Sequence, residues 1–215
     1  MFEILSKYGI YYWKGISVTL ALSFLSLIIG TFLGVLLSLM RLSKRKLLNV
    51  ISKVYISIFR GTPLFVQLSI VHLGLYAVLK INLNPFTSGL IAVSLNSAAY
   101  VAEIIRSGIQ SIDKGQKEAG RSLGLSESQT MKHIIFPQAV RNILPALGNE
   151  FITLVKETSI VSQIGVADLM YGADRVNAIT NNYLAFILVA IFYFVITYIL
   201  SKFLERFEKK VAYND

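Results

Sequence analysis

The sequence has no cysteine and only two histidines, and these absences limit what the protein can do. Without cysteine, disulfide bonds, thiol catalysis and cysteine-ligated metals are excluded. His72 and His133 lie in separate regions of the chain, and no H-E-x-x-H motif occurs. We therefore expect a protein without catalytic residues, without a metal site and without a cofactor of its own, in which His72 packs against neighbouring helices.

Charged residues are also scarce, at 15% of a chain that is 54% hydrophobic. Soluble domains carry about 25% charged residues, so this composition indicates a membrane protein. A chain of 215 residues has room for about five transmembrane helices joined by short loops, and we expect one all-α transmembrane domain over residues 1–215. The net charge of +9 could suggest a nucleic-acid partner. The basic residues lie beside apolar segments, however, where membrane orientation explains them, so we expect a lipid bilayer and no nucleic acid.

Five apolar segments are candidates for membrane spans, and they lie at about residues 15–40, 54–79, 88–107, 139–160 and 183–203. In the first segment, Ser26, Gly30 and Gly34 form a ridge of small residues that allows another helix to approach closely. In the second, we expect Pro63 to break or kink the helix. We interpret residues 161–182, which follow the fourth, as a polar external loop.

The distribution of lysine and arginine predicts the orientation of the spans. Segments 41–53, 106–141 and 202–210 hold fifteen of these residues, whereas segments 1–15, 80–85 and 160–182 hold four. The positive-inside rule then places the N-terminus outside the cell and the C-terminus in the cytoplasm. Five spans agree with this orientation, because an odd number of spans puts the two termini on opposite sides of the membrane.

Polar residues within the third and fourth segments are grouped on one side of each predicted helix. At 100° per residue, Asn96, Tyr100, Glu103 and Ser107 fall within an arc of about 60°, with Ser97 beside them. A glutamate within a span is costly, so Glu103 either lines a cavity or pairs with Arg106 three residues later. In the fourth segment, a similar arc of about 120° holds Asn149, Glu150, Thr153, Lys156 and Glu157.

The polar interval 113–137 separates these two segments. Residues 116–123 are predicted to form a helix that Gly124 ends in a left-handed conformation. Ser126 and Gln129 form the pattern of a capping box for a second helix that runs toward Pro137. Gly115, Gly120, Arg121 and Ser122 imitate a P-loop, but arginine replaces the lysine and no strand precedes it, so we do not interpret the segment as a phosphate site.

The same interval resembles a known family signature. Glu118-Ala119-Gly120, three residues, Gly124, nine residues, Ile134, one residue, Phe136 and Pro137 are similar to the "EAA loop" of ATP-binding-cassette importer permeases. Gly120 replaces the second alanine of that pattern and Phe136 replaces its leucine. The segment RSLGLSESQTMKHIIFPQAVRNILPALGNEF resembles the polar-amino-acid subgroup, and the R-G-T-P motif at Arg60–Pro63 is also typical of it.

The resemblance implies the transmembrane permease subunit of a bacterial amino-acid importer in the inner cell membrane. It implies a coupling loop that docks on a separate cytoplasmic ATPase, and the ATPase rather than this chain binds ATP. The coupling residues would be Glu118, Ala119, Gly120, Gly124, Ile134 and Pro137. Its other expected partners are a second permease chain, either identical or a sibling, and an extracellular or periplasmic amino-acid-binding protein.

For the translocation path, which the family places between helices two to five, the candidate substrate-binding residues are Asn96, Ser97, Tyr100, Glu103, Glu150, Thr153 and Glu157. If Arg106 pairs with Glu103 and Lys156 with Glu157, Glu150 is left without a local basic partner. We therefore hypothesise a basic amino acid as substrate, with glutamine or another neutral polar amino acid as the alternative.

Two other classes of protein remain open from the sequence alone. An ion-coupled secondary transporter could use Glu103, Glu150 and Glu157 as a proton relay. A membrane scaffold that transports nothing would leave the two polar faces without a purpose. The secondary transporter leaves the interval 113–137 unexplained, and an odd number of spans without an internal inverted repeat also counts against it.

Overall fold

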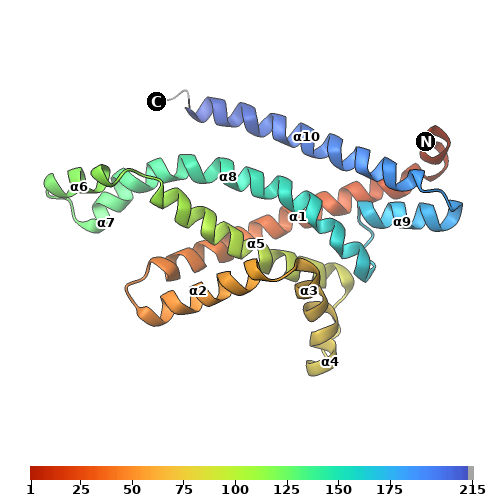
Figure 1. The fold of residues 1–215 in the computed structure, drawn as a ribbon, viewed down its shortest axis with the longest axis horizontal. Helices are drawn as coiled ribbons and strands as arrows, with labels where there is room; N and C mark the ends of the chain where they lie inside the picture. Colours follow the sequence, from red (N-terminus) through yellow and green to blue (C-terminus); the bar gives the residue numbers. More distant parts are fainter. Residues whose placement is uncertain (213–215) are drawn as a thin grey trace.

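The computed structural model of the protein describes residues 1–212, which are predominantly helical and contain no strand (Figure 1). The helices are α1 (Phe2–Leu42), α2 (Lys46–Gly61), α3 (Leu64–Ser69), the π-helical turn η1 (Ile70–Gly74), α4 (Leu75–Leu79), α5 (Pro85–Gln110), α6 (Lys114–Ser122), α7 (Glu127–Thr130), the π-helical turn η2 (Met131–Ile135), α8 (Phe136–Glu157), the 3-10 turn η3 (Thr158–Ile164), α9 (Leu169–Thr180) and α10 (Leu184–Ala212). The predicted all-α fold class is confirmed.

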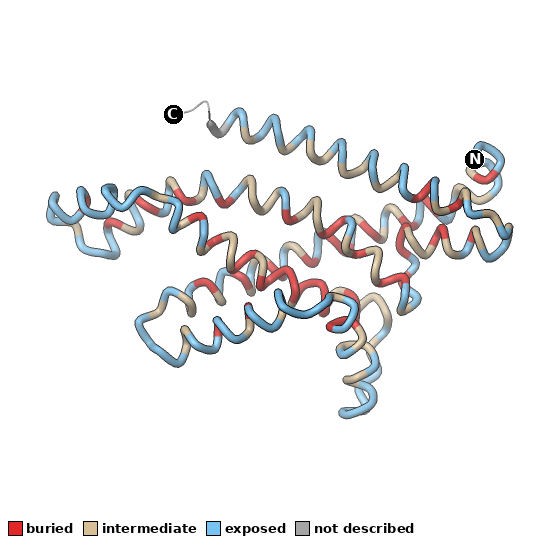
Figure 2. Tube along the Cα trace, in the orientation of Figure 1, coloured by how far each residue is buried: buried red, intermediate tan, exposed pale blue. Residues whose placement is uncertain are grey.

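Helix α5 is the centre of the fold, and α1, α2 and α8 pack against it. Buried residues concentrate along α5, whereas α10 and α4 are largely exposed (Figure 2). Gly34 of α1 lies so close to α5 that a Cβ added to it would be 2.7 Å from the Cβ of Val101. Helices in a membrane associate through this kind of close packing, so the predicted ridge of small residues is confirmed as a helix–helix contact.

Neighbouring residues give the relative direction of the helices. Gly30 lies against Ser97 and Gly34 against Val101, so α1 and α5 run the same way. Gly108 lies against Ile143 while Ser97 contacts Glu150, so α8 runs opposite to α5. The polar faces predicted on these two helices are thereby brought alongside each other.

Three helices of the described chain, α1, α5 and α10, are long and apolar enough to cross a membrane. A fourth crossing results if α2 and the segment Leu64–Leu79 count as one bent span. Helix α8 is not in this set, because polar and charged residues interrupt its apolar sequence. The five spans therefore stay a prediction.

The second apolar segment does not form one straight helix. Its two halves meet at 106° around Thr62 and Pro63. The predicted break at Pro63 is confirmed, because proline has no amide proton and its ring clashes with the preceding turn. The helix before the break begins at Lys46 rather than near residue 54. After the break, α3 and η1 pack against α5, and α4 projects away from the other helices (Figure 1).

The predicted second helix of the interval 113–137 is not a separate element. After α7 the chain widens into the π-helical turn η2 and continues directly into α8, with Pro137 in the first turn of that helix. A π-helical turn has a larger backbone ring, which accommodates the missing amide proton of Pro137 without ending the helix. Gly124 has φ of +79° and the capping box of Ser126 and Gln129 is formed, so both of these local predictions are confirmed.

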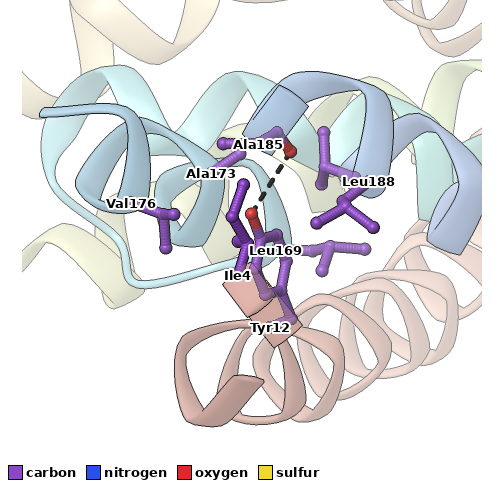
Figure 3. Close-up of a cluster of buried hydrophobic side chains, with 8 residues drawn as sticks. Ile4, Tyr12, Leu169, Ala173, Val176, Ala185 and Leu188 are labelled. Carbon is purple, nitrogen blue, oxygen red and sulfur yellow. Dashed lines mark hydrogen bonds between the residues drawn. The ribbon is translucent and has the colours of Figure 1, made fainter. Parts of the chain in front are cut away.

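Residues 161–182 form more regular structure than the loop that we predicted, because they include η3 and helix α9. Asp168 caps α9 by accepting a hydrogen bond of 2.9 Å from the amide of Tyr171. Helix α9 packs between the N-terminal part of α1 and the beginning of α10, where Tyr12 is fully buried and its hydroxyl donates to the carbonyl of Ala185 at 3.3 Å (Figure 3). The helical spacing of the apolar residues Leu169, Ala173 and Val176, at i, i+4 and i+7, could have indicated the helix.

Candidate functional site

The contact between Glu150 and Ser97 joins the two polar faces. Glu150 of α8 is 9% exposed and accepts a hydrogen bond of 2.9 Å from the Ser97 hydroxyl of α5, which is fully buried. Among the described residues, no basic side chain forms an ion pair with Glu150. A buried carboxylate with only one neutral partner is poorly stabilised in its charged form.

The side chain of Asn96 is hydrogen-bonded to the break in the second apolar segment. Its amide donates to the side-chain oxygen of Gln67 at 2.9 Å and to the carbonyl of Phe59 at 3.2 Å. Gln67 in turn donates to the carbonyls of Phe59 and Thr62 at 2.8 and 3.0 Å. These carbonyls lie at the end of α2, where Pro63 interrupts the helical hydrogen bonds, so both amides compensate for the break.

This arrangement changes the interpretation of Asn96. Both of its amide protons are engaged by protein oxygens, so the donors that Asn96 was expected to offer to a substrate carboxylate are already in use in this structure. Gln67 belongs to the same network and was not among the predicted site residues. A glutamine four residues after a proline break within an apolar segment is the signal that could have identified it.

Glu103 lies among several arginines. The Nε of Arg106 donates to Glu103 at 2.9 Å, and a second guanidinium nitrogen of Arg106 contacts the other carboxylate oxygen. The local pair that the sequence allowed is therefore present. Arg60 approaches the same carboxylate to 4.0 Å and lies 5.4 Å from the ring centre of Tyr100. Arg60, which comes from the R-G-T-P motif, thus joins Tyr100 and Glu103 although neither spacing nor periodicity pointed to that contact.

The remaining candidates lie on the outward side of α8. Asn149 and Lys156 are exposed, while Thr153 and Glu157 are partly buried. The pairing of Lys156 with Glu157 that we considered does not occur within the described part of the chain. A lysine on this face cannot point into lipid, so the face requires water or another polypeptide. Within residues 1–212, no group of three or more acidic or histidine side chains gathers that could hold a metal ion.

The interval 113–137 forms a knob of α6 and α7 at one end of the molecule (Figure 1). Gly120 is buried there, and a Cβ on it would lie 2.8 Å from a methyl carbon of Thr130, so alanine at this position would require the Thr130 side chain to shift. Ile134 packs behind Gly120, while Glu118, Ala119 and Pro137 are exposed. Leu123, which we did not predict as a site residue, is 80% exposed at the tip.

A charged contact connects the knob to the turn between α1 and α2. Lys44 lies 3.3 Å from Glu127 and Lys117 lies 3.9 Å from the same carboxylate. The hydrogen bond from Lys44, followed by the positive charges of Lys44 and Lys117, lowers the pKa of Glu127. Because these side chains are exposed to solvent, the contact contributes to the position of the knob more than to stability.

At the opposite end, Asp168 is buried between α1 and α10. Burial raises the pKa of Asp168 to about 6, against the effect of hydrogen bonds from the amides of Tyr171 and Met170 and from the hydroxyl of Tyr193. This carboxylate holds the beginning of α9 against the other helices, and it lies outside the predicted spans.

Comparison with known proteins finds a matching family and similar sequences over nearly the whole chain. Residues 11–213 match the family "Binding-protein-dependent transport system inner membrane component". The arginine transport system permease protein ArtQ of Bacillus subtilis (strain 168) is 45% identical over 203 residues, which cover 94% of this chain and 93% of that protein. The putative glutamine transport system permease protein GlnP of Rickettsia prowazekii (strain Madrid E) is 43% identical over 202 residues, with 94% and 93% covered.

A solved structure shares the same fold. The crystal structure of an amino acid ABC transporter with histidines contains a chain that is 45% identical, with a TM-score of 0.95 and 98% of each chain covered. Identity and coverage of this size extend the similarity over both polar faces and the knob.

Proposed function

Because the chain belongs to the family of binding-protein-dependent transport system inner membrane components, we propose that it forms the translocation path of an ATP-driven importer for basic amino acids. Members of this family work with a cytoplasmic ATPase and a substrate-binding protein. The chain is a non-catalytic, membrane-spanning permease subunit, and ATP hydrolysis belongs to a separate chain. The amino-acid ABC permease relatives support an ATP-driven importer of amino acids over an ion-coupled secondary transporter.

The observation that carries the proposed substrate is the Glu150 carboxylate. It is buried, it accepts one neutral hydrogen bond from Ser97, and the two arginines beside the polar face of α5, Arg60 and Arg106, contact Glu103 instead. An arriving guanidinium or ammonium group would supply the missing opposite charge. The names of the relatives include both arginine and glutamine, which agrees with an amino acid, and the unpaired carboxylate favours the basic one.

The outward face of α8 supports a second permease chain. Asn149 and Lys156 are exposed at a depth where lipid would be costly, so a facing polypeptide that encloses a water-filled path would stabilise them. A single chain buries Glu150 against α5 but leaves this neighbouring face open. We infer that two permease chains, identical or sibling, enclose the path between their polar faces.

The knob supports the coupling role. It is compact, charged and projects from the end of the bundle, with Leu123 as an exposed apolar residue at its tip (Figure 1). Buried apolar anchors surrounded by polar residues are typical of protein–protein contacts. We infer that Leu123 enters a groove of the ATPase while Glu118 and Arg121 lie at the edge of that contact.

Transport by reconstituted protein tests the proposed function. Liposomes that contain the permease with its ATPase and binding protein should accumulate labelled arginine only when ATP is supplied. Liposomes that contain the permease alone should show no uptake under a proton gradient, because ATP hydrolysis on the separate ATPase chain would drive transport. Uptake driven by the proton gradient without the ATPase would contradict the proposal.

The orientation gives a separate prediction. A reporter that is active only in the cytoplasm, attached after Lys46, Lys114 or Lys210 in three separate fusions, should be active in all three, because the basic residues gather at that end of the helices. A fusion at Asn182, in the segment between α9 and α10, serves as the matched control and should be inactive. An inactive fusion at any of the first three positions, with the protein present in the membrane, would overturn the proposed orientation.

A further inference from the structure

An apolar groove of about 420 Å³ runs between α1 and α8, with α5 as its floor. Val35, Leu39 and Leu42 line it from α1, and Val140 and Leu144 line it from α8. On α1 the lining extends from Thr31 to Leu42, which at 1.5 Å per residue is about 17 Å. That length is close to the thickness of one leaflet of the hydrocarbon core, about 15 Å.

The groove lies on the side of α8 that is turned away from the polar face. At 100° per residue, its lining residues on α8 and the polar face of Asn149, Glu150, Thr153, Lys156 and Glu157 are centred about 125° apart around the helix. If the polar face meets water or a second permease chain, the groove is directed to the surrounding lipid. Its apolar lining is then suited to a hydrocarbon chain.

One end of the groove is bordered by basic residues. Leu42 and Met131 line this end, and the residues that continue from them include Lys44, Arg45, Lys46 and Lys132, all exposed. The acidic residue in contact with this group is Glu127, which Lys44 and Lys117 already neutralise. Excess positive charge at the boundary between hydrocarbon and water attracts anionic lipid headgroups.

We propose that this groove is a binding site for one anionic phospholipid of the leaflet on the knob side. One acyl chain lies between α1 and α8, and the phosphate group is held by Lys132 and the basic turn that follows Leu42. The site is separate from the substrate path, and it does not depend on which amino acid is carried. Because the turn also contacts Glu127 of the knob, the lipid borders the segment that meets the ATPase.

Lipid retention tests this site directly. The permease–ATPase complex is freed of endogenous lipid, exposed to equal amounts of phosphatidylglycerol and phosphatidylcholine with identical acyl chains, and examined by native mass spectrometry. Phosphatidylglycerol is expected to be retained at one molecule per permease chain, at least tenfold over phosphatidylcholine. Equal retention of the two lipids would overturn the headgroup assignment and with it the proposal.

Substitutions in the groove localise the binding. Leu144→Trp fills the groove and should lower retention of phosphatidylglycerol at least tenfold, while Val140→Phe narrows it and should give an intermediate loss. Ile199→Trp on the exposed side of α10 is the matched control, because Ile199 is 48% exposed and Leu144 is 42% exposed. Lys132→Gln combined with Arg45→Gln should make retention of the two lipids equal. Unchanged retention in both groove variants, or the same loss in the control, would overturn the site.

The alternative occupant is a helix of a second permease chain. The native sequence has no cysteine, so Leu144→Cys introduces a single thiol into the groove. A bifunctional thiol reagent applied to membranes should leave this variant as single chains if lipid occupies the groove. Cross-linked pairs of permease chains would show that a protein occupies it and would overturn the proposal.

Discussion

Glu150→Gln is expected to lower ATP-dependent uptake of arginine and lysine at least a hundredfold and to leave uptake of neutral amino acids within about threefold. Glutamine has the same shape and still accepts the hydrogen bond of the Ser97 hydroxyl, so the variant removes charge alone. Removing one partner of a buried ion pair costs about 3–5 kcal/mol, and a hundredfold change in affinity corresponds to about 2.7 kcal/mol. The measurement is competition between labelled arginine and labelled glutamine in reconstituted liposomes.

The control for this prediction is Glu205→Gln. Glu205 is exposed and pairs with Lys202 on α10, far along the chain from the polar faces, so its replacement should leave all uptake within about twofold. Ser97→Ala should have a smaller effect than Glu150→Gln, because it removes only the group that orients the carboxylate. Arginine carried equally well by the wild type and by Glu150→Gln would return Glu150 to a structural role.

Gly124→Val is expected to lower ATP-dependent uptake of every amino acid at least tenfold, while the protein still inserts into the membrane. Gly124 has φ of +79°, a conformation in which a β-branched residue is strongly disfavoured. No atom lies within 4 Å of the position that a Cβ would take, so the effect comes from the backbone and not from a clash. The valine would displace α7 relative to α6 and change the shape of the knob.

Asparagine at the same position provides the matched comparison, because it tolerates the left-handed conformation. Gly124→Asn should keep uptake within about twofold and should co-purify with the ATPase as the wild type does. Normal association with the ATPase and normal transport in Gly124→Val would remove the knob from the coupling mechanism. Because Glu150→Gln affects basic amino acids selectively and Gly124→Val affects all of them, the two roles can be separated.

Several features of this protein follow from its sequence because short-range interactions determine them. The capping box of Ser126 and Gln129, the left-handed Gly124 and the pair of Glu103 with Arg106 each involve residues within a few positions of one another. The break at Pro63 follows from the chemistry of proline itself. The helical membrane class follows from composition, and the family resemblance of the interval 113–137 agrees with the comparisons over nearly the whole chain.

Other features needed the tertiary structure. Periodicity placed Asn96 on the same face as Glu103, but only the fold shows that Gln67 and the carbonyls of the broken helix engage its amide. The same applies to Arg60, whose approach to Glu103 depends on how α2 crosses α5. The widening at η2, through which the knob continues into α8, could not be read from Pro137, because proline permits several ways of relieving its clash.

The sequence by itself determined that this is a helical membrane protein with a capped, glycine-terminated knob and with acidic residues on the polar sides of two helices. The tertiary structure decided that Ser97 contacts Glu150 across 53 positions of sequence, that Lys156 does not reach Glu157, and that an apolar groove opens between α1 and α8. The physical reason is the range of the interactions. Helix caps, turns and i,i+3 pairs depend on neighbours in the chain, whereas contacts between helices depend on their rotation and crossing, which packing of the whole molecule sets.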